Sequence, residues 1–178
     1  ADFFGRQLSP TSFTGAIAIP TVEPMNAKLS RFYLDTSWAG VGGTEKANIL
    51  RAFDIEILTG LHPKFAGSGN RYFNAHGQGP ISVTANFTFE GGSDADAMFD
   101  AQQAKTFQVL RLAVIGSQIG SGVNHSLKID IGGEWDSVSP LSSEDRGDNL
   151  HSAVLMGRYD GTAAKMLQVV TVTDVDAY

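Results

Sequence analysis

Several pairs of carboxylates in this chain have a single residue between their two members. This spacing could support acid–base or cation chemistry. Two carboxylates held side by side can share a proton or bind a hard cation. Each pair also has a simpler role: the water-facing side of a strand, negative charge at a helix start, or part of a tail. Such pairs include Asp54 with Glu56, Asp94 with Asp96, and Asp174 with Asp176. We expect none of them to be catalytic.

Histidine and nucleophile patterns do not indicate an enzyme either. No two of the four histidines stand at the i, i+2 or i, i+4 spacing that builds a metal-binding face. The chain has no cysteine and no Gly-x-Ser-x-Gly motif, which excludes thiolate sites, disulfides and that type of serine nucleophile. The histidines are His62, His76, His125 and His151. We therefore predict a protein that is not an enzyme and uses no metal or cofactor.

The glycine-rich residues 38–46 (WAGVGGTEK) come nearest to a phosphate-binding loop. They lack the Gly-Lys-Ser/Thr ending of such loops, and no helix pattern follows to supply N-terminal N–H groups. We expect a long, exposed connection between two strands instead.

Composition limits the class of protein further. The 178 residues suffice for one domain with a sizeable core, and no run is apolar enough to cross a bilayer. The formal net charge is −6, whereas proteins that bind nucleic acids present basic patches. We expect a soluble chain that neither inserts into a membrane nor grips DNA.

Residues 81–116 carry three periodicities in succession and indicate the fold class. Apolar residues alternate with polar ones from Ile81 to Phe89, which is typical of a strand with one buried face. Gly91 and Gly92 end this strand, and Ser93 is placed to cap a helix over about residues 94–105. A β-rich run follows at 107–115. The pattern predicts a mainly β protein: an antiparallel β-sandwich or barrel with one flanking α-helix.

The remaining residues supply further strands of one domain. Residues 1–30 are expected to form an N-terminal arm with an edge strand at 13–19, and residues 31–178 the sandwich. Turn-forming residues between 60 and 80 indicate a long surface connection with one brief strand at 71–74. Gly132-Gly133 indicates a β-bulge, and Asp160-Gly161-Thr162 predicts that the last two strands form a hairpin. Strands are also expected at 31–35, 50–58, 125–131, 150–159 and 166–173.

Several short segments of the chain occur in an ordered set. They are FYLD at 32–35, LRAFDIEILTG at 50–60 leading into HPKF at 62–65, the strand 81–90 with its helix, VLRL at 109–112, LKID at 127–130 with GEW at 133–135, and DRGDN at 145–149. From residue 31 onward this set resembles the tail tube (major tail) proteins of long-tailed bacteriophages. The resemblance implies a β-sandwich with a flanking helix, whose copies form hexameric rings that stack into a hollow tube for genome passage.

Membership of such a family also implies partners and a location. The partners are other copies of the chain and other tail proteins, in the virion tail and, during assembly, in the host cytoplasm. Six copies of net charge −6 carry −36 per ring, so a channel lined by carboxylates would let DNA slide without specific binding. Unpaired strand edges would be satisfied by neighbouring subunits.

The resemblance gives two sets of candidate residues. Acidic residues on the water-facing sides of strands are expected to line the channel. The irregular arm and the glycine-rich loop are expected to form contacts between subunits or rings, because both contain large apolar groups and little regular structure. The channel set is Asp54, Glu56, Glu90 and Asp130. The contact set is Phe3, Phe4, Phe13, Trp38, Val41 and Lys46.

Two other classes of function stay open from the residues alone. A carbohydrate-binding β-sandwich module needs the same strands and an exposed aromatic beside acids, for which Trp135 between Glu134 and Asp136 is the candidate. A β-rich enzyme is the weaker alternative, because no pairing of a nucleophile with a base is visible.

Overall fold

The computed structural model describes residues 24, 26–67, 69, 72–139, 143–145 and 148–174. These residues fall in two compact units, one within Ile57–Ser82 and the other within Val22–Glu56 and Val83–Tyr178. We call them the hairpin unit and the sandwich unit. In chain order the elements are η1 (Ala27–Leu29), β1 (Ser30–Asp35), β2 (Leu50–Leu58), β3 (Leu61–Lys64), β4 (Ala75–Gln78), β5 (Ser82–Glu90), α1 (Ser93–Gln103), β6 (Gln108–Gly120), β7 (Val123–Val138), β8 (Ser143–Asp145), β9 (Asp148–Gly157) and β10 (Leu167–Val172).

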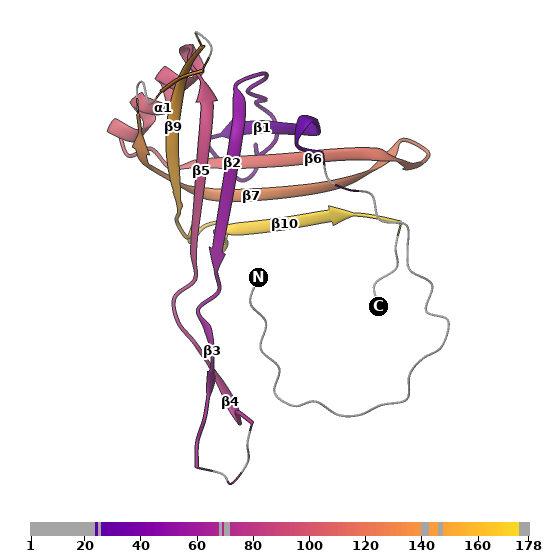
Figure 1. The fold of residues 1–178 in the computed structure, drawn as a ribbon, viewed down its shortest axis with the longest axis vertical. Coiled ribbons are helices and arrows are strands. Elements are labelled where there is room, and N and C mark those ends of the chain that lie inside the picture. The colour runs from indigo at the N-terminus through magenta and orange to yellow at the C-terminus, as the bar shows by residue number, and fades with distance from the viewer. Residues whose placement is uncertain are drawn as a thin grey trace. The chain divides into compact units, whose positions relative to one another are not determined.

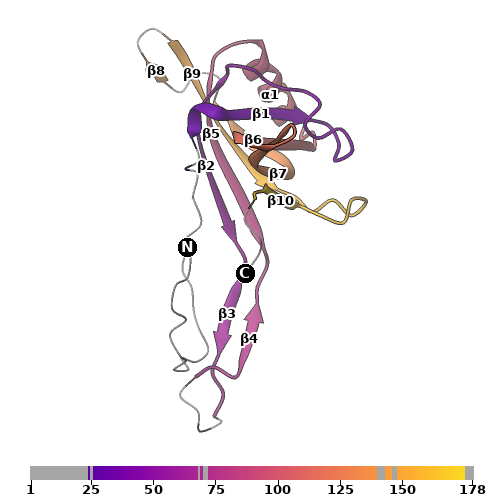
Figure 2. The same cartoon turned by 90° about the vertical axis from the view of Figure 1, so that its right-hand side faces the viewer.

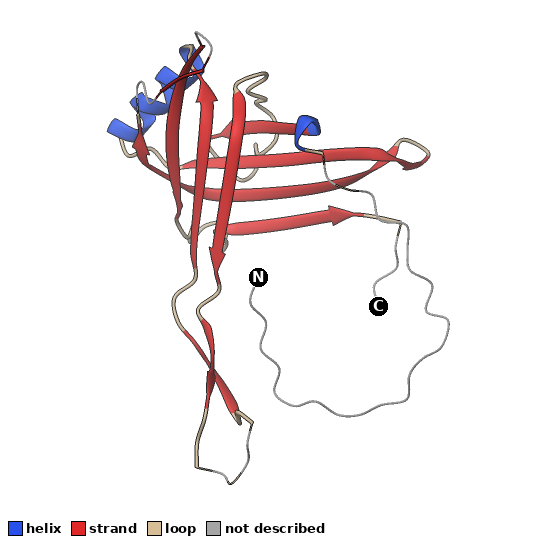
Figure 3. Ribbon diagram, in the orientation of Figure 1, coloured by secondary structure: helices blue, strands red, loops and turns tan. Residues whose placement is uncertain are grey.

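One sheet makes up most of the sandwich unit and folds across itself. Its strand order is β1–β6–β7–β9–β5–β2, with β10 beside β7 and β8 beside β9. β7 is shared, because residues 126–131 pair with β10 and residues 133–138 pair with β9, both antiparallel. In Figure 1, β6 and β10 run across the direction of β5 and β9, and Figure 2 shows the same strands from the side. The predicted fold class, mainly β and antiparallel with one α-helix, is confirmed (Figure 3).

The predicted hairpin of the last two strands is wrong. β9 and β10 each pair with β7 and not with one another. The turn between them does have the expected chemistry, since the carboxylate of Asp160 accepts from the N–H of Thr162 at 2.8 Å. That turn closes a bridge between Asp160 and Lys165 only, and the strands beyond it diverge to different halves of β7.

Gly132 and Gly133 mark the point where β7 changes partner. Gly132 donates its N–H to the carbonyl of Met166, just before β10, at 2.9 Å. A Cβ on Gly133 would collide with the backbone carbonyl of Met156 on β9, so only glycine allows the two strands to approach this closely. The β-bulge predicted at this dipeptide is wrong, because the register shift against β9 lies after Trp135.

Aromatic side chains from both layers form the centre of the core. The ring centre of Phe32 on β1 lies 5.5 Å from Phe87 and 5.0 Å from Phe89 of β5. Trp135 of β7 meets the same two phenylalanines edge-on and donates its indole N–H to Gln108 at 2.6 Å. All four aromatic residues are at most 3% exposed. The alternation predicted for residues 81–90 is confirmed by the burial of every second residue of β5.

The helix α1 is shorter than the predicted range of 94–105. Gly92 is its N-cap residue and no side chain caps it, so the capping role expected of Ser93 is wrong. The two acidic residues expected in the first turn are present there, where negative charge favours the helix dipole. Ala95 and Met98 form its buried face, each 1% exposed. Lys105 lies beyond the helix end with a φ of 51°.

The hairpin unit replaces the long connection expected between residues 60 and 80. β3 and β4 pair antiparallel, with Lys64 opposite Ala75. Gly60 has a φ of 65° and accepts a hydrogen bond from the N–H of Gly79 at 2.8 Å, which closes the other end of the ribbon. The brief strand predicted at 71–74 is wrong for residues 72–74, because pairing with β3 begins at residue 75; residue 71 lies outside the described residues.

Candidate assembly surfaces

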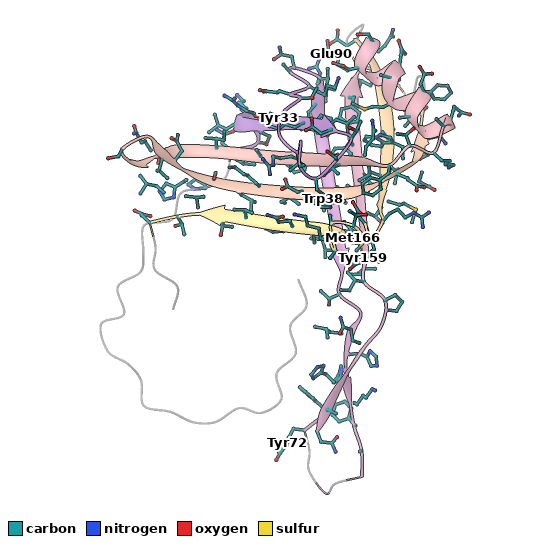
Figure 4. The ribbon with its side chains drawn as sticks, turned by 180° about the vertical axis from the view of Figure 1, so that it is seen from behind. Tyr33, Trp38, Tyr72, Glu90, Tyr159 and Met166 are labelled. Atoms are coloured by element: carbon teal, nitrogen blue, oxygen red, sulfur yellow. The ribbon has the colours of Figure 1, made fainter. Side chains whose placement is uncertain are left out.

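The acidic residues expected to line a channel do not share one environment. Asp54 and Glu56 are exposed on β2. Glu90, at the end of β5 (Figure 4), forms an ion pair with Arg51 at 2.9 Å. Arg51 also contacts Asp148 at 2.8 Å, so one guanidinium is shared by two carboxylates and offsets only part of the charge of Glu90. Of these residues, Asp54 and Glu56 best match a water-facing carboxylate, and their place in a channel stays a prediction.

Asp130 is buried, so the water-facing position expected for it is wrong. It is 1% exposed, and its two oxygens accept from Nε and Nη2 of Arg111 at 2.6 and 2.8 Å. This hydrogen bonding is the main cause that raises the pKa of Arg111, while burial acts in the opposite direction. The alternation along residues 125–131 is misleading here because β7 is covered on both sides: the core lies on one face and the connection after β1 on the other.

Arg111 and Asp130 belong to a row of polar residues that crosses four strands. Tyr33 of β1 lies opposite Arg111 of β6, Arg111 opposite Asp130 of β7, and Asp130 opposite Gln168 of β10. Directly opposite residues on neighbouring strands share one face of a sheet. Gln168 in turn accepts from Nζ of Lys165 at 2.7 Å. We call Tyr33, Arg111, Asp130 and Gln168 the polar row; Tyr33, at one end of it, is labelled in Figure 4.

The connection between β1 and β2 folds back over the polar row. The carboxylate of Asp35 accepts from the N–H groups of Gly42 at 2.8 Å and Thr44 at 3.1 Å. Gly42 has a φ of 89°, and a Cβ there would lie 2.5 Å from Nη1 of Arg111. Val41 and Gly42 are half-buried. The expectation that residues 38–46 form an exposed loop is therefore wrong for the centre of the loop.

Two residues expected to meet other subunits have partners within the chain. Trp38, labelled in Figure 4, packs against Gly132, and Nζ of Lys165 lies 4.7 Å from the centre of its indole ring. Lys46 forms an ion pair of 2.7 Å with Asp94 in the first turn of α1. Both side chains are half-buried. These contacts tie the connection after β1 to the sheet on one side and to the helix on the other.

The rest of the expected contact set is only partly within the described residues. Val41 is half-buried in the connection after β1. Phe3, Phe4 and Phe13, together with the edge strand expected at 13–19, lie outside the described residues. Contacts of this set with other subunits stay a prediction.

β2 is an open edge of the sheet. It stands at the end of the strand order, and within the described residues β5 is its one neighbour in that order. Phe53 is 38% exposed, and Asp54 and Glu56 on the other side of the strand are exposed as well. Neither face of β2 is therefore closed off from water. An open edge with exposed apolar side chains is a surface on which another chain can pair.

The hairpin unit exposes large apolar side chains of its own. Leu61 is 48% exposed, Phe65 71% and Ile81 49%. Phe65 meets Phe73 edge-on, with ring centres 6.4 Å apart. A two-stranded ribbon has no second layer to cover such side chains. We missed this surface from the sequence, because the glycines and prolines around residues 61–65 (LHPKF) favoured a loop over a strand.

Charged clusters give no sign of a ligand site in the described part of the chain. A hollow of about 550 Å³ between β1 and the start of β2 is lined by Lys28, Arg31, Lys46 and Arg51. The last three each form an ion pair with a carboxylate, which leaves little positive charge for an anion. No group of three or more His, Asp or Glu side chains among the described residues could hold a metal ion. None of the described helices is long and apolar enough to cross a membrane.

Comparisons with known proteins bear on the fold. Neither a protein-family model nor a curated protein matches the chain. Among solved structures, the chain is similar to the SPP1 tail tube determined by solid-state NMR and cryo-EM, with a TM-score of 0.57 and 11% identity over 86% of this chain and 81% of that one. It also matches a crystal structure of an Hcp protein, with a TM-score of 0.42 and 11% identity over 80% of this chain and 98% of that one. At such low identity the first likeness establishes the fold alone: this chain has a tail-tube-like fold.

Proposed function

We propose that this protein is a structural component of a phage tail tube, in which its copies assemble into stacked hexameric rings around a hollow channel. The observation that carries the proposal is the tail-tube-like fold, with its TM-score of 0.57 to the SPP1 tail tube. The open edge of β2 and the exposed apolar side chains of the hairpin unit support it, because both are surfaces that a neighbouring copy would cover. The protein acts in the virion tail, after assembly in the host cytoplasm with other tail proteins.

The channel conducts the genome without binding it. A chain of net charge −6 repels the phosphate backbone, so no strong hold on DNA has to be broken during passage. Asp54 and Glu56 are the candidates for its lining. Glu90 contributes less to the field because Arg51 offsets part of its charge, and Asp130 contributes little because it is buried beside Arg111.

A carbohydrate-binding module is the alternative, and the tryptophans argue against it. A sugar platform needs an open aromatic face. Trp135 is 1% exposed in the core, and Trp38 is half-buried against Gly132, with Nζ of Lys165 4.7 Å from the centre of its ring. The chain has two tryptophans, so neither supplies such a platform in this conformation.

Negative-stain electron microscopy of the purified full chain tests the proposed function. We expect hollow cylinders of uniform diameter at high protein concentration, with a mass per ring that corresponds to six copies. A protein that stays monomeric at every concentration, with binding on a glycan array, would instead favour the carbohydrate-binding module.

A pair of variants tests whether the hairpin unit forms contacts during assembly. Leu61→Ser with Phe65→Ser removes exposed apolar side chains and should abolish cylinders while leaving the circular dichroism spectrum and the unfolding midpoint unchanged. Lys64→Ser, also exposed on the same ribbon, is the matched control and should assemble normally. Cylinders of normal length from the double variant would exclude the hairpin unit as an assembly contact.

A further inference from the structure

The connection between β1 and β2 is held by charged groups that make no contribution to the apolar core. Asp35 receives two backbone N–H groups, from Gly42 and Thr44. Arg111 lies directly under Gly42, where even a single Cβ would come within 2.5 Å of its guanidinium. Asp130 holds that guanidinium by two hydrogen bonds, of 2.6 and 2.8 Å. We call Asp35, Arg111 and Asp130 the clamp.

Stability alone does not account for the clamp. Burial of two opposite charges costs about as much desolvation energy as their attraction returns, and well-packed apolar residues of the same size serve a core equally well or better. Charged hydrogen bonds differ from apolar contacts in direction, because a bidentate pair admits one orientation of the guanidinium. The clamp therefore fixes a geometry, and the segment it fixes is the one that crosses above Arg111.

That segment leads directly into the open edge strand. After Gly42, the chain pairs back to β1, with the N–H of Leu34 donating to Thr44 at 3.0 Å and that of Lys46 donating to Phe32 at 2.8 Å. Asn48 then turns the chain with a φ of 63°. The next residue, Ile49, accepts from the N–H of Glu90 at 2.8 Å and so sets the start of β2 against β5.

No ligand needs to be invoked to explain these charges. Both oxygens of Asp35 accept backbone N–H groups, one each, and both oxygens of Asp130 accept from Arg111. The side chain of Asp130 is 1% exposed and that of Arg111 is 21% exposed, so little of the pair faces a partner. The contacts all point inward, to the connection itself.

We propose that Asp35, Arg111 and Asp130 are positioning residues for assembly: they hold residues 36–48 so that β2 presents its free edge in one fixed place before another copy arrives. This inference rests on the proposed function. A rigid edge loses less conformational entropy when it pairs than a mobile one does, and the saving appears as tighter association. The clamp thus acts on assembly through β2, without touching the neighbouring subunit.

Asp35→Asn tests the proposal, with Asp160→Asn as the matched control. Asparagine has the same shape but can accept only one of the two N–H groups at Asp35. Asp160 also accepts two backbone N–H groups, from Thr162 and Ala163, but both on one oxygen and in a turn that does not lead to β2, so Asp160→Asn removes a charge while it can keep both hydrogen bonds. We expect Asp35→Asn to speed hydrogen exchange at the Gly42 and Thr44 amides by about tenfold or more, and to raise the protein concentration needed for cylinders by a similar factor. Asp160→Asn should change that concentration less than about twofold.

A second variant distinguishes removal of the clamp from a general loss of folding. Arg111→Met with Asp130→Leu keeps a packed interior but removes the clamp under Gly42, and it should show the same fast exchange and the same higher concentration for assembly. Fast exchange with unchanged assembly in both variants would overturn the positioning role. Unchanged exchange would overturn the clamp itself. Failure of the unaltered protein to form cylinders would instead count against the proposed function, and the exchange rates would still decide whether the clamp exists.

Discussion

A buried ion pair such as Arg111–Asp130 stabilises a fold only while both partners are present. The side chain of Asp130 is 1% exposed and that of Arg111 is 21% exposed, so both charges have given up most of their water. Their mutual attraction offsets this loss, whereas a single remaining charge would have no compensation. The effect of a substitution at either residue therefore depends mainly on what is left behind.

Arg111→Met alone should lower the free energy of unfolding by about 3–5 kcal/mol at neutral pH, because it leaves a buried carboxylate without a partner. The double variant with Asp130→Leu should recover most of this loss. Urea titration monitored by tryptophan fluorescence measures both. Equal losses for the single and the double variant would contradict this account.

At the scale of elements, β7 has the largest structural role. It pairs with β6, with β10 along its first part and with β9 along its second part. Gly132 and Gly133 stand where β7 changes its partner strand. Neither has room for a Cβ, because atoms of other residues lie too close. The two layers of the sandwich unit are therefore joined through the backbone of one strand and its two glycines.

Gly133→Ala should destabilise the protein by about 3 kcal/mol or more, because its Cβ would collide with the backbone carbonyl of Met156 and that strand cannot move without leaving the sheet. Gly120→Ala is the control: it also lies in a strand, and a Cβ there would meet nothing within 4 Å. Thermal unfolding of both variants gives the comparison. A similar midpoint for the two would show that the β7–β9 approach is less tight than the structure indicates.

Much of the element pattern could be predicted from sequence, because it depends on local periodicity. The strand at 50–58 agrees with β2 at both ends, and the strand at 81–90 differs from β5 only at its first residue. Alternation of apolar and polar residues is set by the strand's own geometry, so no knowledge of partners is needed. The same holds for the helix, which its acidic first turn and small apolar face made visible.

The pairing of the strands and the burial of individual residues could not be predicted from the same alternation of apolar and polar residues. Asp130 alternates with apolar neighbours as a water-facing residue would, yet Arg111, 19 positions earlier in the chain, lies opposite it and a connection covers both. The hairpin unit was missed because its turn-forming residues outnumber its strand-forming ones. Both errors concern contacts between distant segments, and single-sequence periodicity carries no information about those contacts.

For the whole molecule, net charge sets how assembly should respond to salt. Copies of net charge −6 repel each other when they gather in a ring. Raising the ionic strength from about 0.01 M to about 0.15 M shortens the screening length from about 30 Å to about 8 Å. Cylinders should therefore form at a lower protein concentration in the higher salt, as light scattering would measure. Assembly that weakens with salt would show that ion pairs between copies, and not apolar contacts, dominate the interface.

The order of strands in the sheet has a consequence for the timing of folding during translation. β1 pairs with β6, which begins at Gln108. The two halves of β7 pair with β9 and β10, which are made later, and β10 ends at Val172. Each of these pairings closes a long loop, which is slow and costs chain entropy before any contact is gained. A nascent chain still held by the ribosome with these strands inside the exit tunnel has neither layer complete. Newly made copies on one messenger RNA therefore remain unable to join through folded surfaces until β10 of each copy has left the tunnel.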